Sequence, residues 1–195
     1  MKILKNILAI AGFISIGLVL VMMLKLLPII KQFDGFDPKA KEVYLQLFDR
    51  VMQTQSGIEA MVIKTPVEEG VSAADVDQSI RLIANELNIK NVGELPLYKE
   101  VEAMSGASFR FVKIYLLCNA MTAASMLNYS DAFASFLPCR VSLIESKEGK
   151  LWLYTQDMDV MIYGGKPLPP ALKAEAIKVR DIILEIMRRA AEGDF

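Results

Sequence analysis

The feature that most constrains this sequence is an uncharged apolar run at residues 7–24, ILAIAGFISIGLVLVMML. As a helix rising about 1.5 Å per residue, such a run can cross the hydrocarbon core of a bilayer, with Lys5 and Lys25 reaching back to the polar interface. A cleaved signal peptide normally has an apolar region of about 7–15 residues followed by a small-residue cleavage site, and no such site is evident here. A buried core helix would need apolar cover on every side. We therefore expect a membrane anchor over residues 1–31.

The charges around this run do not decide its orientation. Lys2 and Lys5 precede it, and Lys25 and Lys31 follow it. A short N-terminal segment followed by one hydrophobic helix is a common way to export a domain, so we expect the N-terminus inside and the C-terminal domain outside.

Composition excludes several classes of function. The first 31 residues hold four lysines and no acid, which leaves 18 basic and 23 acidic side chains, a balance of −5, for the rest of the chain. This net negative charge on the rest of the chain argues against nucleic-acid binding, which needs a clustered basic face. The absence of histidine excludes a Ser-His-Asp triad, a Cys-His pair, a zinc site with histidine and a histidine-ligated haem.

Hydrophobic periodicity predicts a linker and a juxtamembrane helix in residues 32–56, followed by a globular domain at 57–195 with both helices and strands. The predicted helices are 38–54, 72–87, 98–104, a helical stretch from 119 that is broken at 128–130, and a long helix from 169 or 170 to 191. The predicted strands are 58–67, 108–117, 139–145 and 150–155.

Local signals support these boundaries. Asp37 before Pro38 is typical of a helix start, and Ser72 followed by Asp75 resembles a capping box. Gly149 closes a turn that needs positive φ. Lys113 lies on an otherwise aromatic strand face, where it must reach water or find an acid, and an edge position in the sheet explains it most simply.

Both cysteines flank one helical stretch. If residues 119–136 form an unbroken helix of about 27 Å, Cys118 and Cys139 lie at opposite ends, whereas a bend at 128–130 can make them neighbours. Three interpretations stay open: two small buried hydrophobes, a disulfide, or thiolate chemistry as a sulfur carrier or a metal or haem ligand. Arg140 would favour the thiolate of Cys139, although an exposed strand residue without such a role is the more common case.

A haem in a chain without histidine needs cysteine, methionine or tyrosine as its axial ligand, so a haem with Cys or Met ligation is a candidate cofactor. Met121 and Met126, with the two cysteines, are candidate ligands of a soft metal, and Met158 and Met161 follow nearby. Methionines at helical spacing more often fill a core.

The order of Cys118-Asn119, a broken helix, Leu137-Pro138-Cys139-Arg140 and a hairpin with Gly149-Lys150 resembles domain-of-unknown-function family 302 over residues 57–190. The resemblance implies an α+β fold similar to the TATA-box-binding protein, with a single antiparallel sheet covered by helices, and two copies that pair. It implies no reaction. Members are often found in bacteria with sulfur or redox metabolism. We take Cys118, Asn119, Cys139 and Arg140 as the ligand or redox candidates.

We therefore expect a single-pass protein of the bacterial inner membrane with a periplasmic domain. That domain would be a non-enzymatic accessory module and homodimer that binds a partner, such as a membrane or periplasmic redox protein, or a small cofactor. The alternative is a thiol-active sulfur carrier or disulfide-handling protein that uses Cys118 and Cys139.

Overall fold

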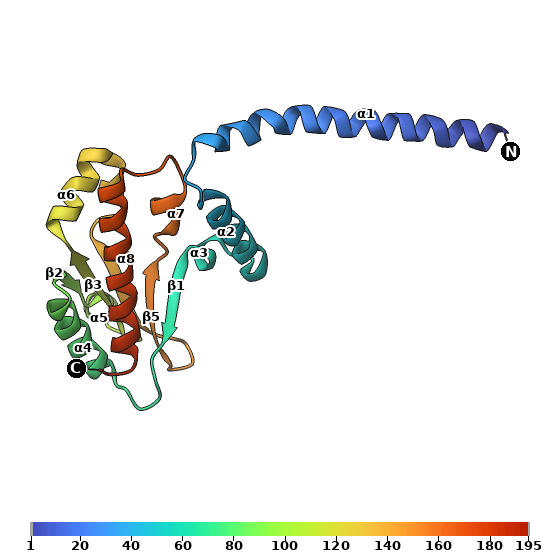
Figure 1. Ribbon diagram of the computed structural model, residues 1–195. Helices are drawn as coiled ribbons and strands as arrows, with labels where there is room; N and C mark the ends of the chain where they lie inside the picture. The colour runs from blue at the N-terminus through green and yellow to red at the C-terminus, as the bar shows by residue number, and fades with distance from the viewer. Residues whose placement is uncertain (1, 195) are drawn as a thin grey trace.

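The computed structural model describes residues 2–194 (Figure 1). Its centre is one antiparallel sheet of five strands in the order β1-β5-β4-β3-β2. The strands are β1 (Val62–Pro66), β2 (Lys90–Leu95), β3 (Val112–Cys118), β4 (Cys139–Glu145) and β5 (Leu151–Gln156). The helices are α1 (Lys2–Gln32), η1 (Phe33–Gly35), α2 (Ala40–Thr54), α3 (Gly57–Ala60), α4 (Ala73–Glu86), α5 (Leu97–Ser105), α6 (Ala120–Tyr129), η2 (Asp131–Ser135), α7 (Asp159–Tyr163) and α8 (Pro170–Ala191).

Helix α1 extends away from the rest of the chain (Figure 1). The stretch Leu8–Gly35 is a candidate membrane span by length and composition: its most apolar window has a mean hydropathy of 2.5, and none of that window is buried. A fully exposed apolar helix of this length is unusual in water, which agrees with the anchor expected from the sequence.

The core lies between one face of the sheet and helices α4 and α8, which run side by side (Figure 1). Side chains alternate along each strand, so every second residue of the three central strands faces these helices. The fully buried core includes Tyr115, Leu117, Val141, Leu143 and Leu153 from the sheet and Ile80, Ile83, Ile183, Ile186 and Met187 from the helices. Burying one such side chain is worth roughly 1.5–3 kcal/mol, so this layer supplies most of the stability of the domain.

The opposite face of the sheet is only partly apolar, since Arg140 also lies on it. Ile114, Ile144, Trp152 and Tyr154 lie on it and are half-buried. This face could bury more apolar area against another copy of the chain, and the expected homodimer stays a prediction.

The two edge strands are both interrupted. Strand β1 exposes Lys64 and ends at the exposed Pro66, which has no backbone N–H to donate. Strand β2 begins with the exposed Lys90 and contains a register shift between Asn91 and Gly93. Neither edge is therefore a long, regular row of free backbone groups.

The linker after α1 is fixed to the domain at Asp37. Its backbone N–H donates to the Gly165 carbonyl at 2.7 Å, its carboxylate accepts from the Lys39 N–H at 3.0 Å, and it forms an ion pair with Lys173 of α8. Asp37 is only 3% exposed. The predicted helix start at Asp37 and Pro38 is two residues early, because Asp37 closes a turn that precedes α2.

Three local predictions are confirmed. Ser72 and Asp75 form a reciprocal capping box, with Asp75 N–H donating to Ser72 Oγ at 3.2 Å and Ser72 N–H donating to Asp75 Oδ2 at 2.9 Å. Gly149 has φ of 77° in the β4–β5 turn. The final helix starts at Pro170 as predicted.

Two predictions about strands are wrong. No strand is predicted at residues 90–95, where the structure has β2, because the sequence KNVGEL contains a glycine and no regular alternation. The predicted strand at 58–67 begins later, because Ser56 Oγ accepts from the Glu59 N–H at 3.2 Å and starts the short helix α3.

Candidate functional site

The structure brings the two cysteines together. Strands β3 and β4 are neighbours, and Leu117 pairs directly with Cys139, so Cys118 lies next to that pair. The chain reverses between them because α6 ends at Tyr129 and Ser130 starts η2, with Ser130 Oγ accepting from the Ala132 N–H at 3.3 Å. The bend expected at 128–130 is therefore confirmed, and the unbroken helix is wrong.

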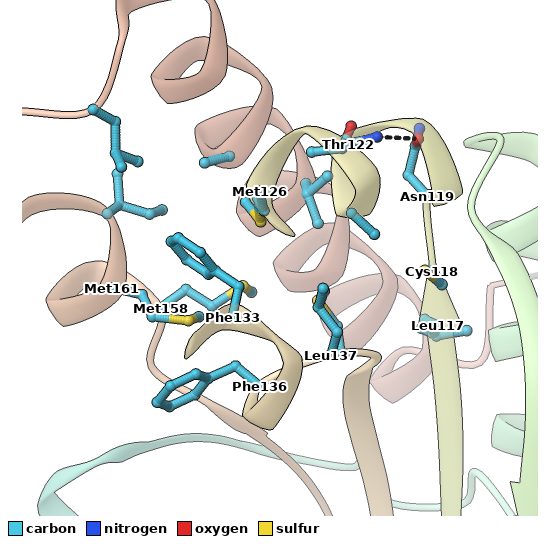
Figure 2. A pocket seen from close by; sticks show the side chains of 16 residues that line it. Leu117, Cys118, Asn119, Thr122, Met126, Phe133, Phe136, Leu137, Met158 and Met161 are labelled. Atoms are coloured by element: carbon cyan, nitrogen blue, oxygen red, sulfur yellow. Dashed lines mark hydrogen bonds between the residues drawn. The ribbon is translucent and has the colours of Figure 1, made fainter. Parts of the chain in front are cut away.

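A cavity lies beside this pair, between the ends of β3 and β4 and the helices α6, α7 and α8 (Figure 2). Its volume is about 30 Å³, which is room for roughly two water molecules. Most of its wall is aromatic, aliphatic or sulfur-bearing, and the side chains include Met126, Phe133, Phe136, Leu137, Met158 and Met161. The cavity is thus an apolar space with thiol and thioether groups in its wall.

The two polar residues of the wall already have hydrogen-bond partners. Asn119 caps α6, with its side-chain oxygen accepting from the Thr122 N–H at 3.1 Å, as the dashed line in Figure 2 shows. Thr122 Oγ donates to Glu175 at 3.2 Å and ties α6 to α8. Asn119, predicted as a ligand candidate, therefore acts as a helix cap at the rim of the cavity.

Both cysteines are free thiols in partly buried positions. Burial, reinforced by the neighbouring Cys118, raises the pKa of the Cys139 thiol to about 11, and the opposing effect of Arg140 is smaller. Arg140 does act in the direction that favours the thiolate of Cys139, but burial outweighs it: Arg140 is exposed, whereas Cys139 lines the apolar cavity. A protonated, buried thiol is a poor nucleophile.

We predict that Cys139 reacts slowly with thiol reagents in the folded protein. In a Cys118→Ser variant at neutral pH, alkylation by iodoacetamide should be at least about tenfold slower than in the urea-unfolded chain, because burial, the largest cause of the raised pKa of Cys139, remains after Cys118 is replaced and reduces the fraction of thiolate. The rate should still rise between pH 9 and pH 10. Timed quenching and mass measurement give both rates, and fast labelling at neutral pH would instead support a thiol-active protein.

Only some of the expected metal ligands lie close together. Cys118, Cys139 and Met126 line the cavity, but Met121 is 77% exposed and lies outside the wall. Within residues 2–194 no cluster of three or more Asp, Glu or Cys side chains could hold an ion. A haem is far larger than the cavity, so it would fit only if the walls moved.

A second group of polar residues, which the sequence did not predict, lies between α4 and strands β2 and β3. Lys113 Nζ contacts Asp77 Oδ1 at 2.5 Å and Glu94 Oε2 at 2.8 Å, and the Tyr115 hydroxyl donates to Asp77 at 2.5 Å. Arg81 donates to both oxygens of Glu94, at 2.9 and 2.8 Å. Strand β3 is central, so the predicted edge position of Lys113 is wrong, and the lysine is instead paired with acids from α4 and β2.

This group of residues stabilises the packing of α4 against strands β2 and β3. Burial alone would raise the pKa of Glu94, but hydrogen bonds from Lys113, Arg81 and Asn91 together hold it below its usual value. Burial and the hydrogen bond to Asp77 raise the pKa of Tyr115, which therefore stays protonated. Two cations face two carboxylates, so the charges are balanced and join α4 to strands β2 and β3.

Comparison with known proteins agrees with the resemblance seen in the sequence. The sequence model described as "Domain of unknown function DUF302" matches residues 63–190. A solved structure, "Crystal structure of uncharacterized conserved protein DUF302 from Bacillus stearothermophilus", superposes with a TM-score of 0.54 at 16% identity, over 67% of this chain and 98% of that one. At this identity the likeness concerns the fold. No curated protein matches the chain.

Proposed function

Because the chain belongs to the DUF302 family, whose function is unassigned, we propose that it is a membrane-anchored binding domain and that its cavity beside Cys118 and Cys139 holds a small apolar molecule. The observation that carries this proposal is the composition of the cavity wall. Apolar pockets with few polar groups are the usual form of small-molecule sites.

The wall suits binding better than catalysis. Asn119 and Thr122 are engaged in hydrogen bonds that hold α6, and the Cys139 thiol is protonated. The methionines of the wall are unbranched and flexible, and they would have to move to admit a guest, because the cavity as it stands has room for only about two water molecules.

The position of the cavity supports a connection to the membrane. Leu168, in the loop between α7 and α8, lines the cavity. Gly165 of the same loop accepts the hydrogen bond from Asp37, where the linker from α1 reaches the domain. The cavity is therefore at the end of the domain to which the anchor is attached, and an apolar guest would have a short path from the bilayer.

We predict that a small uncharged aryl diazirine, added to the full chain in phosphatidylcholine nanodiscs, labels cavity residues such as Met126 and Phe133 after illumination. Ala123→Trp fills the cavity and should lower this labelling by about tenfold, equivalent to ~1.4 kcal/mol of lost binding. Peptide mass mapping reads the labelled sites, and labelling of α1 measures how much reagent entered the bilayer.

The matched control is Ala107→Trp, because Ala107 is exposed and outside the cavity wall. If Ala123→Trp unfolds the domain, Ala123→Leu offers a smaller filling and should give a partial loss of labelling. Labelling confined to α1 in the wild-type protein would contradict the proposed function.

A further inference from the structure

A second, larger hollow lies on the outside of the domain, next to the cavity. It is a groove of about 280 Å³ between α2, the start of β1, the end of β5 and α7. Its apolar wall is formed by Leu47, Met61, Phe136, Val160 and Met161. Met61 is 50% exposed, so the groove is open to the surroundings of the domain.

The groove and the cavity share two side chains. Phe136 and Met161 line both of them, and both also border a small hollow of about 10 Å³ at Cys139. These two side chains therefore form the partition between the outer groove and the inner cavity. Phe136 is 36% exposed, and Met161 is a flexible side chain, so the partition can open by rotamer changes without moving the backbone.

The outer groove also contains a cation with spare donors. Arg50 of α2 donates from Nη2 to Asp157 Oδ2 at 2.6 Å. A guanidinium group has five N–H donors. Its Nε is buried and, within the part of the chain that the structure describes, is the one buried side-chain nitrogen or oxygen without a hydrogen-bond partner. The Arg50 side chain is 33% exposed, so an acceptor group in the groove can reach its outer N–H groups beside the bond to Asp157, while the buried Nε stays out of reach.

We infer that the groove and the cavity are two halves of one site for a long-chain carboxylate. Its carboxylate would bind Arg50 in the groove, and its hydrocarbon chain would pass between Phe136 and Met161 into the inner cavity. The inference rests on the proposed function and adds the class of ligand and its orientation. It also explains how a cavity of only about 30 Å³ could accept a longer molecule, because most of that molecule lies in the groove.

The test uses the full chain in phosphatidylcholine nanodiscs and a palmitic acid analogue with a diazirine at the end of its chain. The corresponding alcohol, which has no charge, serves as the matched probe. The acid should label inner-cavity residues such as Met126 and Leu168 about tenfold more than the alcohol does. Arg50→Gln should remove this difference, and Arg50→Lys, which keeps the positive charge, should retain most of it. Arg110→Gln, at an exposed arginine in another part of the domain, is the control.

A further substitution tests the role of the partition. Phe136→Ala widens the passage and should increase inner-cavity labelling by the acid more than labelling by the small aryl diazirine, because only the long chain has to cross the partition. Equal labelling by acid and alcohol in the wild-type protein, or chain-end labels found only on groove residues such as Leu47 and Met61, would overturn the two-part site. In that case, labelling of the cavity by the aryl diazirine would still support the proposed function. The absence of that labelling would contradict both the proposed function and the two-part site.

Discussion

Replacing Lys113 with methionine should lower the free energy of unfolding of the domain by about 3 kcal/mol, near the low end of the cost of breaking a buried ion pair. Lys113 is 9% exposed and holds Asp77 and Glu94 together. Without it, two carboxylates face one remaining cation, Arg81. The cost stays at the low end because Asp77 and Glu94 each keep 24% of their side chain exposed. Urea unfolding of the full chain in detergent, followed by Trp152 fluorescence, measures the change.

The pH dependence of this effect follows from Glu94. Its pKa is lowered in the folded protein, so its stabilising contribution is present above the unfolded-state value of about 4.3 and is lost as the pH falls through the folded-state pKa. The difference between the wild-type protein and Lys113→Met should therefore shrink below about pH 4.3. A difference that is constant from pH 7 to pH 3 would argue against an electrostatic origin.

Two further variants separate charge from packing. Lys147→Met removes an exposed lysine in the β4–β5 turn and should change stability by no more than about 0.5 kcal/mol. Combining Asp77→Asn with Lys113→Met restores the balance of charge, so the double variant should lose less than the sum of the two single variants. Strict additivity would contradict the pairing of Asp77 with Lys113.

Substituting Ile14 and Leu18 with lysine should release the protein from membranes. Both side chains lie in the middle of α1 and are more than half exposed, at 58% and 66%. Each lysine at the centre of a membrane helix costs about 2.5–3.5 kcal/mol, so the pair would cost roughly 5–7 kcal/mol of insertion free energy. Alkaline carbonate extraction followed by sedimentation should find the variant in the supernatant and the wild-type protein in the pellet.

The control for this prediction adds the same charge elsewhere. Gln46→Lys with Gln53→Lys places two lysines on exposed positions of α2, and this variant should stay in the pellet. If the Ile14→Lys, Leu18→Lys protein also stayed in the pellet, α1 would not be what holds the chain to the membrane.

Features encoded by neighbouring residues were predictable from the sequence. The bend at Ser130, the capping box at Ser72 and the turn at Gly149 each depend on contacts within a few residues, and each was predicted correctly. The same is true of the long amphipathic helix that starts at Pro170. Because the bend was predictable, the approach of Cys118 and Cys139 was among the expected alternatives.

Features that depend on distant partners were not predictable. Strand β2 exists because β3 pairs with it, although its own sequence has weak strand character. Lys113 finds its partners on α4 and β2, and Arg50 meets Asp157 across 107 positions in sequence. The partition formed by Phe136 and Met161 has the same origin, because only the tertiary fold brings these two side chains to the wall of the same two hollows.

The interrupted edges of the sheet matter more for a tethered protein than for one that is free in solution. Copies confined to a membrane surface collide often and with similar orientations, which favours the joining of exposed strands into a continuous intermolecular sheet. Pro66 and Lys64 on one edge and the bulge between Asn91 and Gly93 on the other oppose such joining. A crowded population of these molecules should therefore resist fibre formation at surface densities where straight, unprotected edges would aggregate.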